Sequence, residues 1–292
     1  MKLIKPSFEI LDQQCGLEGI YKQIEIAGRT CYKSEDKITE DSAKGFVERM
    51  IKSGHGAMLE HGTVYLKFET MKSTIHPLDK YYHNKYSKVC TEEGLTKQTK
   101  IVFVTTNYRV LVENGWLDDL KYICEPTEYH ERRITVRFVC DRGVSHEFVR
   151  HRVFSFAQES TRYCNYSKDK FGKELTFIEP CWLEDYNYDD NTYNQLFIDS
   201  LRWAEAHYLD LLKKWDDKIP DKRYKTGFRN NPWTPQQARA VLPNALKTEL
   251  VMTGFVSDWK NFFFLRCPLN AHPQARELAI PLSEEFIKNG WL

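Results

Sequence analysis

Three arginines and a histidine gather within a short run near the middle of the chain. Residues 150–163 read RHRVFSFAQESTRY. A guanidinium group presents a planar fork of donors that binds phosphate oxygens in pairs. The run also holds hydroxyl donors and Gln158, whose amide can read the edge of a heterocycle. These residue types at this spacing favour a site for a phosphorylated heterocycle.

Two other interpretations of the arginine-rich run stay open from the residues alone. In the first, the run is a solvated basic turn that pairs with nearby acids such as Asp141, Glu147 and Glu159. In the second, the run joins the lysine- and tyrosine-rich stretch 80–86 in a single-strand nucleic-acid module. The formal net charge of +1 and the lack of a nucleic-acid motif argue against the second, so no nucleic-acid partner is expected.

Metal-dependent and acyl-transfer chemistry find little support in the sequence. Its histidines at 55, 61, 146 and 151 lack the HxxxH or HExxH spacing of a zinc site, so we expect no metal. Ser160 has no G-x-S-x-G elbow around it, which disfavours a serine nucleophile. Neither a G-x-G-x-x-G nor a P-loop motif is present, so no Rossmann or P-loop nucleotide site is predicted.

The whole run closely resembles the signature of the flavin-dependent thymidylate synthases. The matching positions are Arg150, His151, Arg152, Ser155, Ser160, Arg162 and Tyr163. Further resemblance lies in Ser53-Gly54-His55 with Leu59-Glu60-His61, in Glu147-Phe148-Val149, in Ala238-Arg239 with Leu242-Pro243, in Asn261 with Phe262–Arg266, and in His272. The resemblance covers roughly residues 18–70 and 134–290 and leaves 71–133 outside it.

This resemblance implies an enzyme that methylates dUMP to dTMP with bound FAD. Methylene-tetrahydrofolate would donate the carbon, NADPH would reduce the flavin, and FAD would bind where subunits of a homotetramer meet. The implied dUMP contacts are Glu147, Phe148, Val149, Arg150, Gln158, Glu159, Ser160, Thr161, Arg162, Arg239 and Arg266. The implied FAD contacts are His55, Ala57, Arg150, His151, Arg152, Gln158, Phe255, Val256, Ser257 and Asn261. Arg266 is the implied catalytic residue, because a fixed cation beside the pyrimidine favours ionisation at its N3.

Several positions depart from the family pattern. Ala57 stands where a hydroxyl is common, and Ala157 and Gln158 stand where Asn and Glu are frequent. The stretch 255–257 lacks the Asn and Arg sometimes found there. Cys164 lies next to the signature, but the family mechanism uses no enzyme nucleophile, so we expect this thiol to be incidental.

Hydrophobic periodicity predicts the elements that must position these residues. Helical spacing marks helices at 18–29, 43–51, 108–114, 195–215 and 273–288, a helix that opens at Thr234-Pro235, a helical stretch at 246–266, and a helical segment at 141–152 that starts near Ser145. Alternation marks strands at 64–68 and 134–140, which we expect to pair antiparallel, and a strand-like run at 101–105. Gly54 suits the end of the second helix and would deliver His55 just beyond it.

Strands and long helices without regular βαβ alternation favour an α+β class, with an antiparallel or mixed sheet and several long helices. We expect the fold of the flavin-dependent thymidylate synthases, in one catalytic domain over 1–292 with an elaboration at about 71–133. No run approaches the roughly 20 apolar residues of a membrane span, and the N-terminus has no signal core. Eight scattered cysteines without a CxxC pair are read as reduced thiols in a cytoplasmic protein.

Overall fold

The computed structural model describes residues 1–71, 78–94, 96–183, 192–213 and 232–292. In chain order, its elements are β1 (Lys2–Ile4), β2 (Ser7–Leu11), α1 (Gly16–Tyr32), η1 (Glu35–Lys37), α2 (Ser42–Lys52), α3 (Gly56–Leu59), β3 (Thr63–Met71), α4 (Asp79–Tyr82), β4 (Lys88–Glu93), β5 (Thr99–Asn107), α5 (Tyr108–Asn114), η2 (Leu117–Tyr122), β6 (Arg133–Asp141), α6 (Arg142–Phe148), β7 (Ser155–Gln158), η3 (Asp169–Phe171), β8 (Thr176–Ile178), η4 (Cys181–Leu183), α7 (Thr192–Leu212), α8 (Pro235–Ala238), η5 (Arg239–Val241), β9 (Lys247–Phe255), α9 (Val256–Arg266) and α10 (Pro273–Lys288), where η marks a 3-10 helix. Antiparallel sheets combined with long helices confirm the α+β class.

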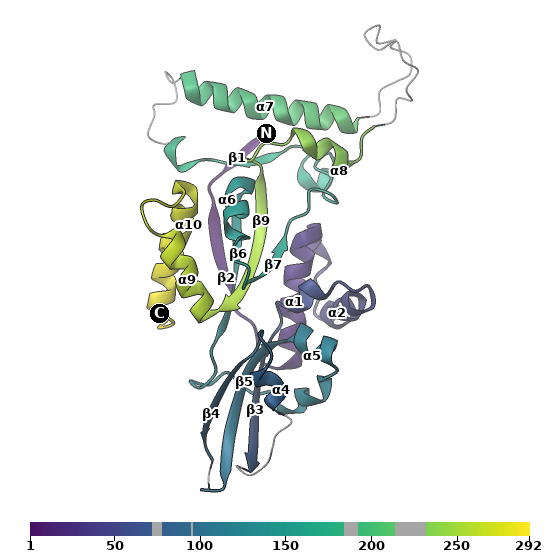
Figure 1. The fold of residues 1–292 in the computed structure, drawn as a ribbon. Helices are drawn as coiled ribbons and strands as arrows, with labels where there is room; N and C mark the ends of the chain where they lie inside the picture. The colour runs from purple at the N-terminus through teal and green to yellow at the C-terminus, as the bar shows by residue number, and fades with distance from the viewer. Residues whose placement is uncertain (72–77, 95, 184–191, 214–231) are drawn as a thin grey trace.

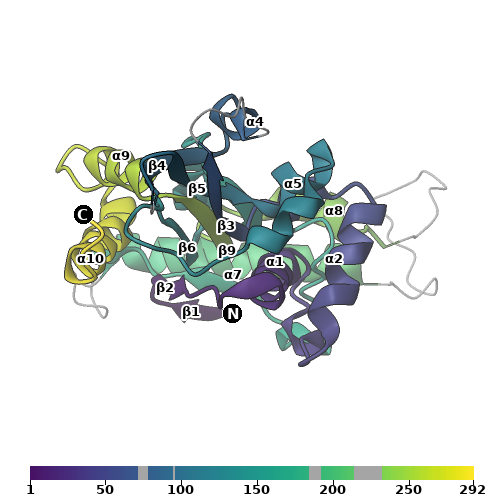
Figure 2. The same ribbon diagram turned by 90° about the horizontal axis from the view of Figure 1, so that it is seen from below.

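The central sheet has the strand order β2-β6-β9-β7, and each neighbouring pair is antiparallel. β6 and β9 pair along their whole lengths, from Arg133 opposite Phe255 to Asp141 opposite Lys247. Figure 2 shows α9 and α10 on one side of these strands and α1 on the other. The short strand β7 carries the middle of the arginine-rich run, so the sheet fixes the direction of that run.

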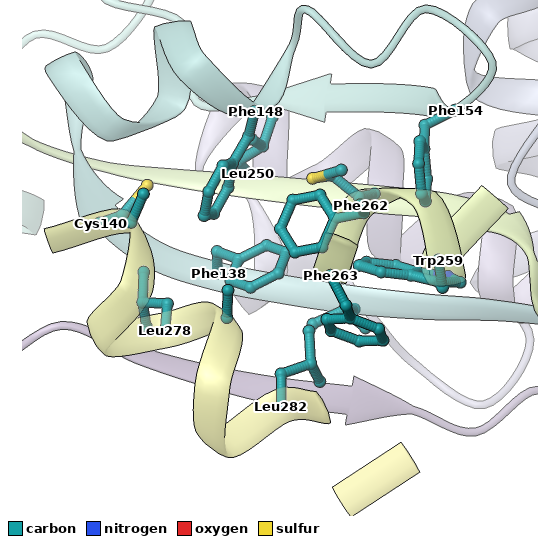
Figure 3. Close-up of a cluster of buried hydrophobic side chains, with 14 of the residues drawn as sticks. Phe138, Cys140, Phe148, Phe154, Leu250, Trp259, Phe262, Phe263, Leu278 and Leu282 are labelled. Atoms are coloured by element: carbon teal, nitrogen blue, oxygen red, sulfur yellow. The ribbon is translucent and has the colours of Figure 1, made fainter. Parts of the chain in front are cut away.

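An aromatic core holds the arginine-rich run against the central sheet (Figure 3). Phe138 of β6 packs against Trp259 and Phe262 of α9. Phe148 and Phe154, which flank the Arg-His-Arg triplet, belong to the same cluster, and the Phe148 and Phe262 rings meet edge to face at 5.0 Å. Because buried aromatic rings contribute much of a core's apolar burial, both ends of the triplet are firmly anchored.

Residues 246–266, which we predicted to be largely helical, instead form strand β9 followed by helix α9. The prediction was therefore wrong for its first half. Met252 of β9 packs in the aromatic core, whereas Val251 packs against Ala27 of α1 on the opposite face. A strand that is buried on both faces lacks the alternation of apolar and polar residues that distinguishes a strand from a buried helix.

A second, antiparallel sheet has the order β3-β5-β4. The predicted pairing of 64–68 with 134–140 was wrong, because β5 pairs with β3 while β6 pairs with β2 and β9. This sheet shares a core with α1 and α2, in which Val64 and Val104 pack with Ile20. Its first strand starts at Thr63, eight residues before the expected start of the elaboration.

Helix α7 lies across the end of the molecule opposite the second sheet (Figure 1). It packs with β8 and α8 around Phe177 and Tyr208. The helices predicted at 108–114 and 273–288 are confirmed with those bounds. Of the helix predicted at 195–215, residues 214 and 215 lie outside the described residues. Within the described ranges, no helix combines the length and the apolar character that a membrane span requires.

Candidate functional site

Helix α6 both starts and ends earlier than predicted, and it ends just before the arginine-rich run. Asp141 caps it by accepting a hydrogen bond from Val144 N at 2.6 Å, so the helix begins at Arg142 rather than near Ser145. It stops at Phe148, so the prediction of a helical segment through residue 152 was wrong for the Arg-His-Arg triplet, which lies beyond the end of the helix. The triplet therefore forms a turn between α6 and β7.

The guanidinium group of Arg266 is held at this turn by three hydrogen bonds. Its Nη1 donates to Glu147 Oε2 at 2.8 Å, its Nη2 to the Glu147 carbonyl at 2.7 Å, and its Nε to His151 Nε2 at 3.0 Å. Burial and the neighbouring Arg266 lower the pKa of His151 to about 4, so this imidazole is neutral near pH 7 and accepts from Arg266. The arrangement makes Arg266, at the end of α9, a fixed cation.

The other two residues of the triplet point into solvent. The Arg150 side chain is 73% exposed and lies 3.7 Å from Glu147 Oε1. Arg152 is also exposed, and within the described residues no carboxylate pairs with it. Phe148 is buried in the aromatic core and Val149 packs at its edge, so any substrate contact from these two residues is made by their backbone.

A second group of polar residues lies at the other end of β7. Gln158 donates to Ser145 Oγ at 2.8 Å and to Thr248 Oγ1 at 3.3 Å. In the loop that follows, Arg239 Nη1 donates to the buried Thr161 Oγ1 at 3.4 Å, and Arg162 is exposed. β7 lies between the two groups along the chain, since Arg266 is held at the turn before this strand and Arg162 lies in the loop after it.

Glu159 points away from this surface. Its carboxylate is buried and accepts hydrogen bonds from Lys247 Nζ at 2.9 Å and from Tyr166 Oη at 2.8 Å. Lys247 also pairs with Glu249, which in turn pairs with Lys33. Because the Glu159 carboxylate is buried, the predicted contact of this residue with dUMP would come from its backbone. The opposite charges of Lys247 and Glu249, two residues apart, are the local signal for this cluster in the sequence.

The backbone of the same loop remains close to the site. Glu159 N donates to the Glu249 carbonyl at 2.8 Å, and Ser160 N donates to the Cys31 carbonyl at 3.0 Å. Cys31 lies near the end of α1, so β9 and α1 together fix the loop. These backbone bonds hold the loop in place above the buried carboxylate of Glu159.

The turn predicted at Gly54 and His55 forms as expected. Gly54 adopts φ +70°, a left-handed conformation that ends α2 and places His55 at the start of α3. His55 and Ala57 are both exposed. α3 packs against β7, which brings this turn beside the signature. His61, in contrast, is fully buried and bonds Thr253 Oγ1 at 2.8 Å, so it has a structural position.

The segment 255–257 uses its own backbone donors within the chain. Phe255 N donates to Asp258 Oδ2 at 3.0 Å, Val256 N to the Arg132 carbonyl at 3.0 Å, and Ser257 N to Glu131 Oε1 at 3.1 Å. Flavin contacts from this segment therefore need groups other than these N–H donors. Asn261, one turn further along α9, is exposed.

Two further observations bear on alternative chemistry. Cys164 forms no disulfide bond, and burial raises the pKa of its thiol to about 12, so it is not a thiolate near neutral pH. Across the described part of the chain, no cluster of three His, Cys, Asp or Glu side chains is arranged to hold a metal ion.

A family model described as "Thymidylate synthase complementing protein" matches residues 125–289, more than half of the chain. The chain belongs to this family. The resemblance drawn from the signature is thereby confirmed. The matched region includes the triplet, β7, β9 and α9, and it leaves the β3-β5-β4 sheet outside.

Curated relatives of this chain bear the name flavin-dependent thymidylate synthase. The flavin-dependent thymidylate synthase of Mycolicibacterium vanbaalenii is 25% identical over 266 residues, which cover 90% of this chain and 74% of that protein. The enzyme of the same name from Mycobacterium tuberculosis H37Rv is 26% identical over 259 residues, 88% of this chain and 71% of that one. A solved UMP/dUMP methylase, PolB from Streptomyces cacaoi with 5-Br dUMP, gives a TM-score of 0.42 at 17% identity over 99% of this chain and 93% of that chain. That TM-score is too low to bear on fold or function.

Proposed function

We propose that this protein is a thymidylate synthase that methylates dUMP to dTMP with bound FAD. Methylene-tetrahydrofolate is the carbon donor and NADPH is the reductant in this proposal. Its main support is the fixed guanidinium of Arg266 beside the family signature, together with membership of the family. Relatives at 25–26% identity bear the name flavin-dependent thymidylate synthase.

Arg266 has the properties that activation of a pyrimidine requires. Removing the proton from N3 leaves negative charge on the ring, and a guanidinium that is already in place stabilises that charge without reorganisation. Only 14% of the Arg266 side chain is exposed, so its field is screened less by water than that of a surface arginine. Glu147 and His151 keep the group oriented: the Glu147 carboxylate pairs with it, while the neutral imidazole of His151 accepts a hydrogen bond without adding a second charge.

The residues predicted to hold FAD fit a dinucleotide in their chemistry. Arg150 and Arg152 offer exposed guanidinium forks of the kind that bind a pyrophosphate. His55 and Asn261 add exposed polar groups on α3 and α9. When bound, reduced flavin supplies the hydride for the methylation, while these side chains bind and orient it.

The nucleotide pocket is divided between the two ends of β7. Residues near Arg162 and Arg239 supply cations for a phosphate, and Arg266 supplies the cation for the ring. We infer that these groups meet across subunits of a cytoplasmic homotetramer, where the Arg162 end of one copy faces the Arg266 end of another.

The proposal is tested by NADPH oxidation measured with and without dUMP and methylene-tetrahydrofolate. Purified protein is expected to be yellow, and the oxidation of NADPH is expected to yield dTMP only when both substrates are present. A colourless protein that does not take up FAD, or one that produces no dTMP, would refute the proposal.

A further inference from the structure

Three segments that we predict to contact the flavin meet at one buried side chain, that of Arg133. Its Nη1 donates to the carbonyl of Glu60 at 3.0 Å, in the segment that follows the His55 turn. Its Nη2 donates to Ser155 Oγ at 3.3 Å, within the signature. Its Cζ lies 5.5 Å from the centroid of the Phe255 ring, where β9 passes into α9. Arg133 is only 8% exposed, so it joins the three segments from inside the protein.

The positive charge of Arg133 is not balanced by an acid. The Glu60 carboxylate pairs with Arg109 Nη1 at 2.5 Å, and the Asp258 carboxylate accepts from Phe255 N. No carboxylate among the described residues lies within ion-pair distance of Arg133, and its buried Nε has no hydrogen-bond partner there. The carboxylates of Glu60 and Asp258 therefore bind other groups and not Arg133.

A buried guanidinium without a counter-charge costs folding free energy, because its hydration is lost and no ion pair replaces it. Burial accordingly lowers the pKa of Arg133 to about 10. An apolar side chain of similar size would fill the same space without this cost. The arginine must therefore serve something other than stability, and an anionic ligand held by the surrounding segments would offset the unbalanced charge.

We propose that Arg133 is a positioning residue for FAD, which holds the His55 turn, the signature strand and the Phe255 turn in their ligand-binding arrangement. This inference rests on the proposed function and deepens it. The relevant ligand chemistry is the dinucleotide's pyrophosphate anion together with the flavin ring. Arg133 acts through Glu60, Ser155 and Phe255 and is not itself placed against the ligand.

The decisive experiment compares apo-protein stability with FAD affinity in the variant Arg133→Met. Methionine fills the site without a charge, so the thermal unfolding midpoint of the apo-protein is expected to equal or exceed that of the wild type. The dissociation constant for FAD, from the quenching of flavin fluorescence, is expected to rise by roughly tenfold or more, because preorganisation of the site is lost. A purely structural arginine would instead give lower stability with a matching loss of affinity.

A matched control lies four residues further along the same strand. Arg137 pairs with Glu9 at the surface of β2 and β6, and Arg137→Met is expected to leave FAD affinity unchanged. If Arg133→Met does not fold, Arg133→Lys decides, since lysine keeps the charge but lacks the fork that reaches both Glu60 and Ser155. Weaker FAD binding by that variant supports the proposal.

The outcomes separate this inference from the proposed function. Wild-type FAD affinity in Arg133→Met or Arg133→Lys overturns the role of Arg133 and leaves the enzyme assignment intact. Failure of the wild-type protein to bind FAD overturns both.

Discussion

Replacing Lys247 with Met tests whether the buried charges under the nucleotide loop act as a unit. Lys247 bonds two carboxylates, Glu159 at 2.9 Å and Glu249 at 2.6 Å, and its side chain is 15% exposed. Glu249 would keep its second cation, Lys33, at 2.8 Å. Glu159, which is 1% exposed, would keep only the neutral hydroxyl of Tyr166. The loss therefore falls mainly on Glu159.

Its magnitude follows from that asymmetry. Removing one partner of a buried ion pair costs about 3–5 kcal/mol, and because Glu249 retains Lys33 we expect the lower end, about 3 kcal/mol. For a chain of this size, that corresponds to a melting temperature lower by roughly 6–12 °C. Urea denaturation of the apo-protein measures the free energy, and calorimetry measures the melting temperature.

A second substitution serves as the control. In Lys247→Met with Glu159→Gln, the neutral amide keeps its bond with Tyr166 and no longer buries a charge, so most of the lost stability is expected to return. A single variant within about 1 kcal/mol of the wild type would refute this reasoning, since so small a loss is typical of exposed pairs. A double variant no more stable than the single one would refute it equally.

The remaining predictions concern the reaction and its pH limits. Arg266→Ala is expected to retain FAD while kcat for dTMP falls by about 10²–10³-fold, and normal turnover would contradict its role. A mixture of Arg266→Ala and Arg162→Ala protomers, unfolded and reassembled together, is expected to regain activity that each lacks alone; no recovery would argue against a pocket shared between chains. Cys164→Ala is expected to keep full activity, and loss of turnover in a folded variant would restore a thiolate mechanism. Burial lowers the pKa of His61 to about 3, so as the pH falls below 6.5 the imidazole takes up a proton in the unfolded chain before it does so in the folded protein. The free energy of unfolding of the wild type is therefore expected to drop relative to that of His61→Gln by about 1.4 kcal/mol per pH unit. Parallel plots of unfolding free energy against pH for the two proteins would contradict this.

Helices with one apolar face were predictable from the sequence. The helix from Pro273 to Lys288 was predicted with its observed bounds, because Pro at the first turn marks its start and an apolar stripe runs along it. The helix from Tyr108 to Asn114 was predicted equally well, and its ends are fixed locally by the Asn107 cap and by Gly115 at φ +71°. Such signals lie within a few residues of one another, so they are readable without tertiary contacts.

β9 and its partners were not predictable in the same way. Its residues are apolar on both faces because α9 and α10 cover one face while α1 covers the other. The partner of β3 was also not readable from local sequence. It is β5, about 35 residues further along the chain, and not the expected strand at 134–140. Register and pairing of this kind are tertiary properties, which local periodicity does not encode.

In the candidate site, the sequence indicates which residue types are present but not the direction in which each side chain points. The family resemblance marked Arg266 and His151 as site residues, and the structure joins their side chains at 3.0 Å. It also marked Glu159, whose neighbours Gln158 and Ser160 are half-buried while its own carboxylate turns into the protein. A carboxylate in a binding motif is equally suited to a ligand or to a buried lysine, and only the position of Lys247 on β9 decides between them.

Two groups of buried charge in the described protein border the signature. Arg133 lies beneath its first residues without a counter-ion, and Lys247 with Glu159 lies beneath its last residues as a charged network. Apolar side chains in these places would give a more stable fold, since buried charges lose more in hydration than a pair regains. Proteins keep such features mainly where function requires them. We therefore infer that these two groups of buried charge position the signature residues for ligand binding, and that the chain is less stable as a result.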